Sequence, residues 1–272
     1  MKIKYFTSLL LVGGISLTAC KKEGCTDPLA DNYDENAKKE DSSCVYTNDN
    51  TSVDVYFDHK WGMMASDFAM NTELVHPMTE DTLTFNNFKY YVSNFQLKNE
   101  NGEWWIHPES YFLLDLSDGV NAKITIDDVP QGTYTEMKYV LGVDSARNVS
   151  GAQDGALSVA NNMFWSWTTG YIMLKAEGTS PQSGTGNFSF HLGGFEGDFN
   201  VVTKKSAAFG ATALIVDDQG TSEVHMVANP AKLWHGSPSV SEVSMTHMPG
   251  ETAVTMTSNF YGNIALDYVQ NN

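Results

Sequence analysis

The chain has 272 residues, of which 42% are hydrophobic and 18% charged, a composition typical of a globular protein with a sizeable core. Acidic residues outnumber basic ones by 33 to 16, so the formal net charge is -17. A charge of this sign opposes binding to phosphate backbones and anionic lipid, and we therefore expect no nucleic-acid partner.

The first nineteen residues have the pattern of a cleaved export signal. Two lysines precede an apolar run over 5–17, which ends in Leu-Thr-Ala-Cys at 17–20. This ending resembles the bacterial lipobox, in which the cysteine is lipidated and becomes the new N-terminus; a plain secretory signal is the alternative. The run is shorter than the ~20 residues that a membrane span needs. We predict a signal peptide at 1–19, lipidation of Cys20, membrane contact only through this lipid, and a location in the bacterial cell envelope, on the periplasmic or surface face of the outer membrane.

A small module is predicted for residues 20–50. Cys25 and Cys44 are the cysteines that remain, and export places them in an oxidising compartment where a disulfide forms. The bond would close a loop of about 20 residues, which the chain-entropy model values at roughly 3 kcal/mol. The segment between them is polar, and the stretch 24–46 resembles the short GCTD…A-x-NY…SCxY modules of secreted proteins from Bacteroidetes-type bacteria. A solvated spacer is favoured over a calcium site, because the glycine and glutamate offsets of an EF-hand are missing.

Short alternating runs of apolar and polar residues separated by turn residues recur through 51–272. This pattern predicts an all-β fold, a β-sandwich of the Ig-like or jelly-roll-like type. Short helical turns are expected at 152–161 and 230–233, and no long helical period is identified. The expected strands are 53–57, 82–85, 89–97, 111–116, 122–126, 134–143, 187–192, 209–216, 241–246 and 253–257.

The most aromatic stretch of the chain is 161–178. On a strand, Met163, Trp165 and Trp167 would share one face. We expect a kink at Gly170, followed by a second strand with its apolar side chains inward. Either tryptophan could be an oxidised residue or an electron relay, but burial in the core is favoured, because an indole buries ~150 to 250 Å².

Five motifs, in order, resemble one family. They are YYVSNFQL at 90–97, ESYFLLD at 109–115, the run 141–181 that contains the aromatic stretch, FHLGG at 190–194, and the closing run 244–269. Together they are similar to the MbnP-like family of copper-binding proteins, relatives of the methanotroph copper proteins that carry an oxidised tryptophan. The resemblance covers roughly 53–269.

The resemblance implies a β-rich copper-binding domain at 51–272, which in the best-studied members uses two histidines and a tryptophan oxidised to kynurenine, sometimes through a partner di-haem enzyme. Imidazole suits copper. His191 in FHLGG matches a family histidine, and His247 matches less specifically. Trp105 and His107 reproduce a Trp-x-His spacing of one relative, which makes Trp105 the first candidate for oxidation, ahead of Trp165 and Trp167. Phe112 stands where relatives often have histidine.

His59 is a further candidate ligand, because Trp61, Met63 and Met64 nearby offer soft groups suited to Cu(I). Each histidine could instead be a hydrogen-bonded structural residue. His76 and His235 adjoin turn residues and are expected at the surface.

Enzyme motifs are missing, including a Gly-x-Ser-x-Gly elbow, a phosphate-binding glycine loop and a His-Glu-x-x-His pair. We therefore predict a lipid-anchored envelope protein that binds copper for acquisition, storage or delivery rather than catalysis. The alternative is an adhesion or ligand-binding sandwich in which the aromatic residues form a recognition surface and no metal binds.

Overall fold

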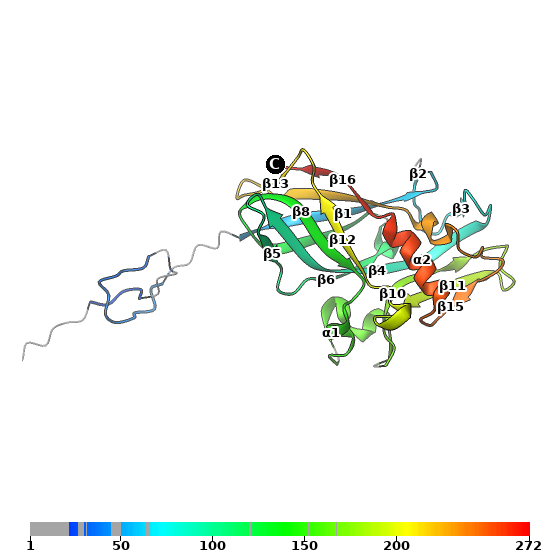
Figure 1. Ribbon diagram of the computed structural model, residues 1–272, viewed down its shortest axis with the longest axis horizontal. Helices are drawn as coiled ribbons and strands as arrows, with labels where there is room; N and C mark the ends of the chain where they lie inside the picture. The colour runs from blue at the N-terminus through cyan, green and yellow to red at the C-terminus, as the bar shows by residue number, and fades with distance from the viewer. Residues whose placement is uncertain are drawn as a thin grey trace, which may run out of the picture. The chain divides into compact units, whose positions relative to one another are not determined.

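The computed structural model describes residues 22–26, 30, 32–44, 50–63, 66–119, 121–151, 153–166 and 168–272 (Figure 1). The predicted signal peptide, the lipidation site Cys20, Met64 and Trp167 lie outside the described residues. The chain divides into two compact units, residues 1–48 and 49–272. Across the described ranges, no helix combines the length and the apolar character needed to cross a membrane.

The small unit contains the predicted disulfide. Cys25 and Cys44 are bonded, with 4.7 Å between their Cα atoms, which confirms the pairing. Glu40 accepts hydrogen bonds of 2.8 Å from the backbone nitrogens of Thr26 and Ser42. The module is therefore held by one covalent bond and by carboxylate contacts rather than by a large apolar core.

The larger unit is built on two sheets (Figure 1). In the smaller sheet, β14 lies between the first strand of the unit, β1, and the last, β16. It pairs in parallel with β1 and antiparallel with β16. Its strands are β16 (Ala265–Gln270), β14 (Ser222–Ala228), β1 (Asn50–Trp61), β2 (Ser66–Asp67) and β7 (Asn121–Pro130), the last paired with β1.

The larger sheet has eleven strands and is centred on β4 (Thr82–Asn99). The first half of β4 pairs with β10 (Gly170–Thr179) and the second half with β8 (Gly132–Leu141). The order continues outward to β12 (Thr203–Ala208) on one side, and to β11 (Asn187–Gly193) and β15 (Met245–Thr246) on the other. Five short strands pair along this path: β3 (Glu73–Val75), β5 (Trp104–Ile106), β6 (Tyr111–Asp115), β9 (Phe164–Ser166) and β13 (Leu214–Val216).

The core lies between the sheets and is rich in aromatic rings. Phe57 of β1 contacts Tyr90 of β4 and Tyr139 of β8 edge-on, at 6.3 and 6.4 Å between ring centroids. Phe57 is fully buried, as are Tyr90, Phe95 and Leu97 of β4. Two sheets packed face to face confirm the predicted β-sandwich.

The strand predicted at 253–257 is wrong, because these residues lie in helix α2 (Glu251–Gly262). Polar residues between apolar ones imitate a period of two. The buried positions, however, follow a helical period: Ala253, Met256, Thr257, Phe260 and Tyr261. Phe260 packs on Phe88 and Tyr90 at 5.5 and 5.3 Å, so α2 closes this end of the core.

The helical turns predicted near 152–161 and 230–233 are confirmed as short 3-10 helices. The short helices of the unit are η1 (Leu116–Asp118), α1 (Ser145–Asn148), η2 (Gly155–Leu157), η3 (Val159–Asn161), η4 (Gly197–Phe199) and η5 (Pro230–Trp234). The surface position predicted for His76 is wrong: its Nε2 lies 2.9 Å from the Ala231 carbonyl of η5, and its Nδ1 accepts from the Thr79 amide. His235 is exposed, as predicted.

Candidate metal centre

Polar side chains gather on the outer face of β10 and β11. Lys175 lies opposite His191, and Glu177 lies opposite Ser189. Because directly opposite residues share a face, these four side chains form one patch. The alternate residues of β10 and β11, including Ala176 and Phe190, are buried on the core side.

Two of the predicted histidines meet on this patch. Strand β15 pairs in parallel with β11, with Met245 opposite Ser189. Two positions further along the chain from this pair are His247, directly after β15, and His191 of β11. Their imidazole rings are stacked at 4.0 Å between centroids, with 12° between the planes. Parallel strands lie about 4.8 Å apart, so the register places the rings side by side.

A chain of hydrogen bonds orients both rings. Nε2 of His191 lies 2.7 Å from Oε1 of Glu177, and Nε2 of His247 lies 2.7 Å from Oγ of Ser189. Ser189 in turn donates to the same carboxylate oxygen at 3.3 Å, while Asn87 of β4 donates to the other oxygen at 2.7 Å. If each Nε2 carries the proton, every donor in this hydrogen-bond network has an acceptor. The network then leaves the Nδ1 lone pair of both imidazoles for another ligand.

The electrostatics support a neutral His191 beside an ionised Glu177. Burial lowers the pKa of His191, and the neighbouring His247 and Lys175 lower it further, although the Glu177 bond opposes the shift. Burial raises the pKa of the Glu177 carboxyl, but hydrogen bonds from His191 and Asn87 outweigh it and leave that pKa below its ordinary value. A neutral imidazole is the form that binds a metal ion.

This arrangement fits copper by its donor chemistry. Imidazole is a good copper ligand, and metal-bound histidines usually donate their second ring nitrogen to a carboxylate or another polar group. Glu177 and Ser189 provide such partners here. In the part of the chain that the structure describes, neither Nδ1 has a hydrogen-bond partner.

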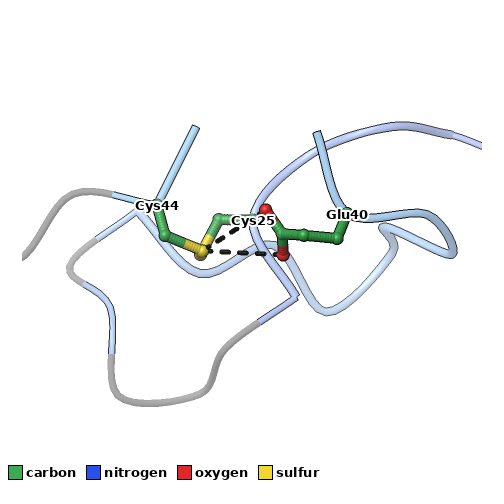
Figure 2. A group of neighbouring side chains, drawn as sticks. All are labelled: Cys25, Glu40 and Cys44. Carbon is green, nitrogen blue, oxygen red and sulfur yellow. Dashed lines mark hydrogen bonds between the residues drawn. A yellow bond between two sulfur atoms is a disulfide. The ribbon is translucent and has the colours of Figure 1, made fainter. Parts of the chain in front are cut away.

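Another compact group of potential ligands lies in the small unit. Among the described residues, one set of three or more histidine, cysteine or acidic side chains brings its ligand atoms within 4.8 Å of one another: Cys25, Glu40 and Cys44 (Figure 2). Its two sulfurs are tied in the disulfide, so neither is a thiolate that could bind a metal. The metal candidate in the larger unit is therefore a histidine pair supported by a carboxylate, not a three-ligand cage.

The segment that leads into β9, the strand that carries Trp165, contacts the same patch. Lys175 is 7% exposed, and its ammonium donates to the Asn162 carbonyl at 2.5 Å, while burial lowers its pKa. Three residues further on, Trp165 covers Gly193, where an added Cβ would lie 2.7 Å from Cζ3 of the indole. Gly193 and His191 are two apart on β11 and so share a face. Trp165 is half-buried there, against the core, in line with its predicted packing role.

The other predicted ligands lie elsewhere in the unit. His59 is fully buried between the sheets, with Nε2 3.0 Å from the Tyr90 hydroxyl. Trp105 and His107 share a face, as their spacing predicts, with rings 5.7 Å apart. Nδ1 of His107 accepts from the Glu109 amide at 3.0 Å, which places its proton on Nε2 and disfavours metal binding there.

Sequence reasoning missed the residues that support the histidines: Asn87, Lys175, Glu177 and Ser189. The available indication was the pair of charged side chains, Lys175 and Glu177, in a strand that is otherwise apolar. A charged residue in such a strand needs a partner. The identity of that partner depends on β11, which the local sequence does not specify.

The larger unit is thus a β-sandwich that carries a paired-histidine site on the outer face of one sheet. The family model MbnP matches residues 50–254, and the chain belongs to this family. A solved structure, MbnP from Methylosinus trichosporium, is 14% identical, covers 75% of this chain and 83% of its own, and superposes with a TM-score of 0.45. The search of curated proteins found no match.

Proposed function

We propose that this protein binds copper through His191 and His247, for acquisition, storage or delivery of the metal in the cell envelope. Membership of the MbnP family supports a copper-related role. The observation that carries the proposal is the stacked histidine pair, whose Nε2 atoms are held by Glu177 and Ser189. Bound copper would supply a soft, redox-active ion on the face of the sheet.

The residues of the chain supply the rest of the site. Glu177 accepts a hydrogen bond from Nε2 of His191 and so orients the ring. Ser189 donates to the same carboxylate and accepts from Nε2 of His247. Lys175 holds the loop of β9 in place through Asn162. Trp165 then covers one side of the patch and limits the access of water to it.

Copper loading of the Cys20→Ser form tests the proposal. We expect metal retained after desalting, measured by elemental analysis following incubation with Cu(I). His191→Ala and His247→Ala should each weaken retention at least tenfold, whereas His235→Ala, which changes an exposed histidine directly after η5, should not. Retention at the level of surface adsorption would overturn the proposal. Equal retention in all three variants would assign copper to other ligands.

We also propose that Trp165 is the indole most open to oxidation, ahead of Trp105. It covers Gly193, two positions from His191, whereas Trp105 lies beside His107, which the hydrogen bonds disfavour as a ligand. A di-haem enzyme is the partner class that would perform the oxidation. Peptide mass mapping of protein from the native host checks this: the kynurenine mass change should fall on the Trp165 peptide, and an unmodified peptide would retire the idea.

The lipid anchor is a proposal from the signal sequence. Metabolic labelling with an alkyne fatty acid should tag the wild-type protein in a membrane fraction. Cys20→Ser should abolish both the label and the membrane association, while Cys25→Ser, which retains the lipobox, should keep them. A labelled Cys20→Ser form would contradict the anchor.

A further inference from the structure

A groove of about 720 Å³ lies on the outer face of the larger sheet, where the second half of β4 runs beside β5 and β8. Its volume falls within the range of small-molecule sites, roughly 300 to 1,000 Å³. The lining residues come from β4, β5, β8 and β12 and from the loops at their ends. None of them belongs to the hydrogen-bond network of His191 and His247.

Strand register explains why these side chains face the groove together. Gln96 of β4 lies opposite Ile106 of β5 and opposite Lys138 of β8, which itself lies opposite Ser206 of β12. Opposite residues share a face, so the four form one row across four strands.

A second row runs beside the first. Val140 of β8 lies opposite Lys204 of β12, two positions along from Lys138 and Ser206. The alternate residues Phe95 and Tyr139 are buried in the core. The groove therefore occupies the solvent side of the sheet.

The groove is locally basic in a strongly acidic chain. Lys138 and Lys204 both line it, and within the described residues neither has a carboxylate at ion-pair distance. Lys98, on the neighbouring row, is paired with Glu136 at 3.6 Å. The Lys138 ammonium also lies 3.7 Å from the centre of the Trp104 ring.

Lys205 also lines the groove, but its ammonium donates to the Tyr261 carbonyl at 2.9 Å. Because Nδ1 of His107 accepts the Glu109 amide, a neutral His107 presents an Nε2 donor. Asp144 is the carboxylate that lines the groove, and it accepts hydrogen bonds from Tyr111 and from Asn94, the latter at 2.9 Å. Two ammonium groups and an imidazole donor thus favour a ligand rich in acceptors.

An apolar surface lies next to these donors. Ile106 is 60% exposed although it is a large hydrophobic residue, and Val140 and Val202 line the same groove. An apolar surface combined with unpaired cations suits a ligand that has both an apolar body and a negative charge.

We propose that this groove binds a small organic carboxylate, with the carboxylate between Lys138 and Lys204 and the apolar body on Ile106 and Val140. The proposal goes beyond copper binding and does not depend on it. It assigns a role to the Trp105–His107 segment other than metal ligation, since His107 serves as a hydrogen-bond donor at the edge of the groove.

Amide chemical shifts of the isotope-labelled Cys20→Ser protein provide the test. The probe is 4-phenylbutyrate, and its neutral amide, 4-phenylbutyramide, is the matched control. We expect the carboxylate to shift the amides of Gln96, Ile106 and Val140, and the neutral amide to bind at least tenfold more weakly. The double variant Lys138→Gln, Lys204→Gln should lose at least tenfold in affinity.

A second double variant, Lys60→Gln, Lys232→Gln, removes the same charge outside the groove and should bind 4-phenylbutyrate as the parent does. Equal affinity for the two probes would overturn the proposal, because the cations would then have no part in binding. Shifts confined to other surfaces, or equal losses in both double variants, would overturn it as well. Copper retention measured in parallel should stay unchanged in all variants.

Discussion

The Glu177 carboxylate accepts a hydrogen bond of 2.7 Å from Nε2 of His191, on the neighbouring strand. This contact orients the ring and leaves Nδ1 for another ligand. Removing such a supporting partner typically costs 10- to 100-fold in metal affinity. We expect Glu177→Gln to weaken copper binding by about this factor, measured by competition with a Cu(I) chelator.

The matched control is Glu223→Gln. Glu223 also contacts a histidine nitrogen, that of His225 at 2.9 Å, but on the smaller sheet. Copper affinity should not change in this variant. If both substitutions reduced the affinity equally, the effect would come from net charge and not from the orientation of His191.

Copper binding should depend on pH in one direction. Because the pKa of His191 lies below its ordinary value of 6.5, the ring stays neutral at neutral pH. The contribution of His191 to copper affinity should fall only as the pH drops through this lowered pKa, where protons compete for the ring. NMR titration of the His191 ring in the metal-free protein from pH 8 to 5 checks this, and a midpoint above pH 6.5 would contradict a lowered pKa.

The same shift contributes to folding. The unfolded chain binds a proton at His191 more readily than the folded protein does, so stability from this group is present above pH 6.5 and is lost as the pH falls through the folded pKa. His191→Gln should therefore reduce the loss of the melting temperature between pH 7 and 5, measured without metal. His235→Gln, at an exposed position, should leave that loss unchanged.

Gly178 permits the close packing of β4 against β10. A side chain there would overlap the Thr84 carbonyl and would approach the Phe188 ring to 2.7 Å. Gly178→Ala should destabilise the unit by about 1 to 3 kcal/mol, as measured by denaturant unfolding. Gly184→Ala is the control, since nothing lies within 4 Å of its added Cβ, and it should change stability by less than about 0.5 kcal/mol.

The disulfide should stabilise the small unit alone. In the double variant Cys25→Ser, Cys44→Ser, the loss of the loop constraint costs roughly 3 kcal/mol in the chain-entropy model. We expect rapid amide exchange over 32–44 and an unchanged melting temperature for the unit at 49–272. A lowered melting temperature of that larger unit would show that the two units are energetically coupled.

The sequence by itself determined the elements that depend on local pattern. Alternation with a period of two identifies many strands, although β12, β14 and β16 were not predicted, and Cys25 and Cys44 form the predicted disulfide. The ordered motifs identify the family that matches residues 50–254. Helix α2 could have been predicted from the sequence, since its buried positions repeat at helical spacing. The polar residues between them, however, give the alternation of a strand.

The tertiary structure alone decided which histidines meet. His191 and His247 are far apart in the chain and come together through the parallel register of β11 and β15. Likewise, Lys138 and Lys204 line one groove because β8 and β12 pair. Register between distant strands is set by the packing of whole sheets, and a shift of one residue would turn every side chain to the other face. Local sequence therefore supplied the candidate ligands, and the register of the larger sheet selected the pair.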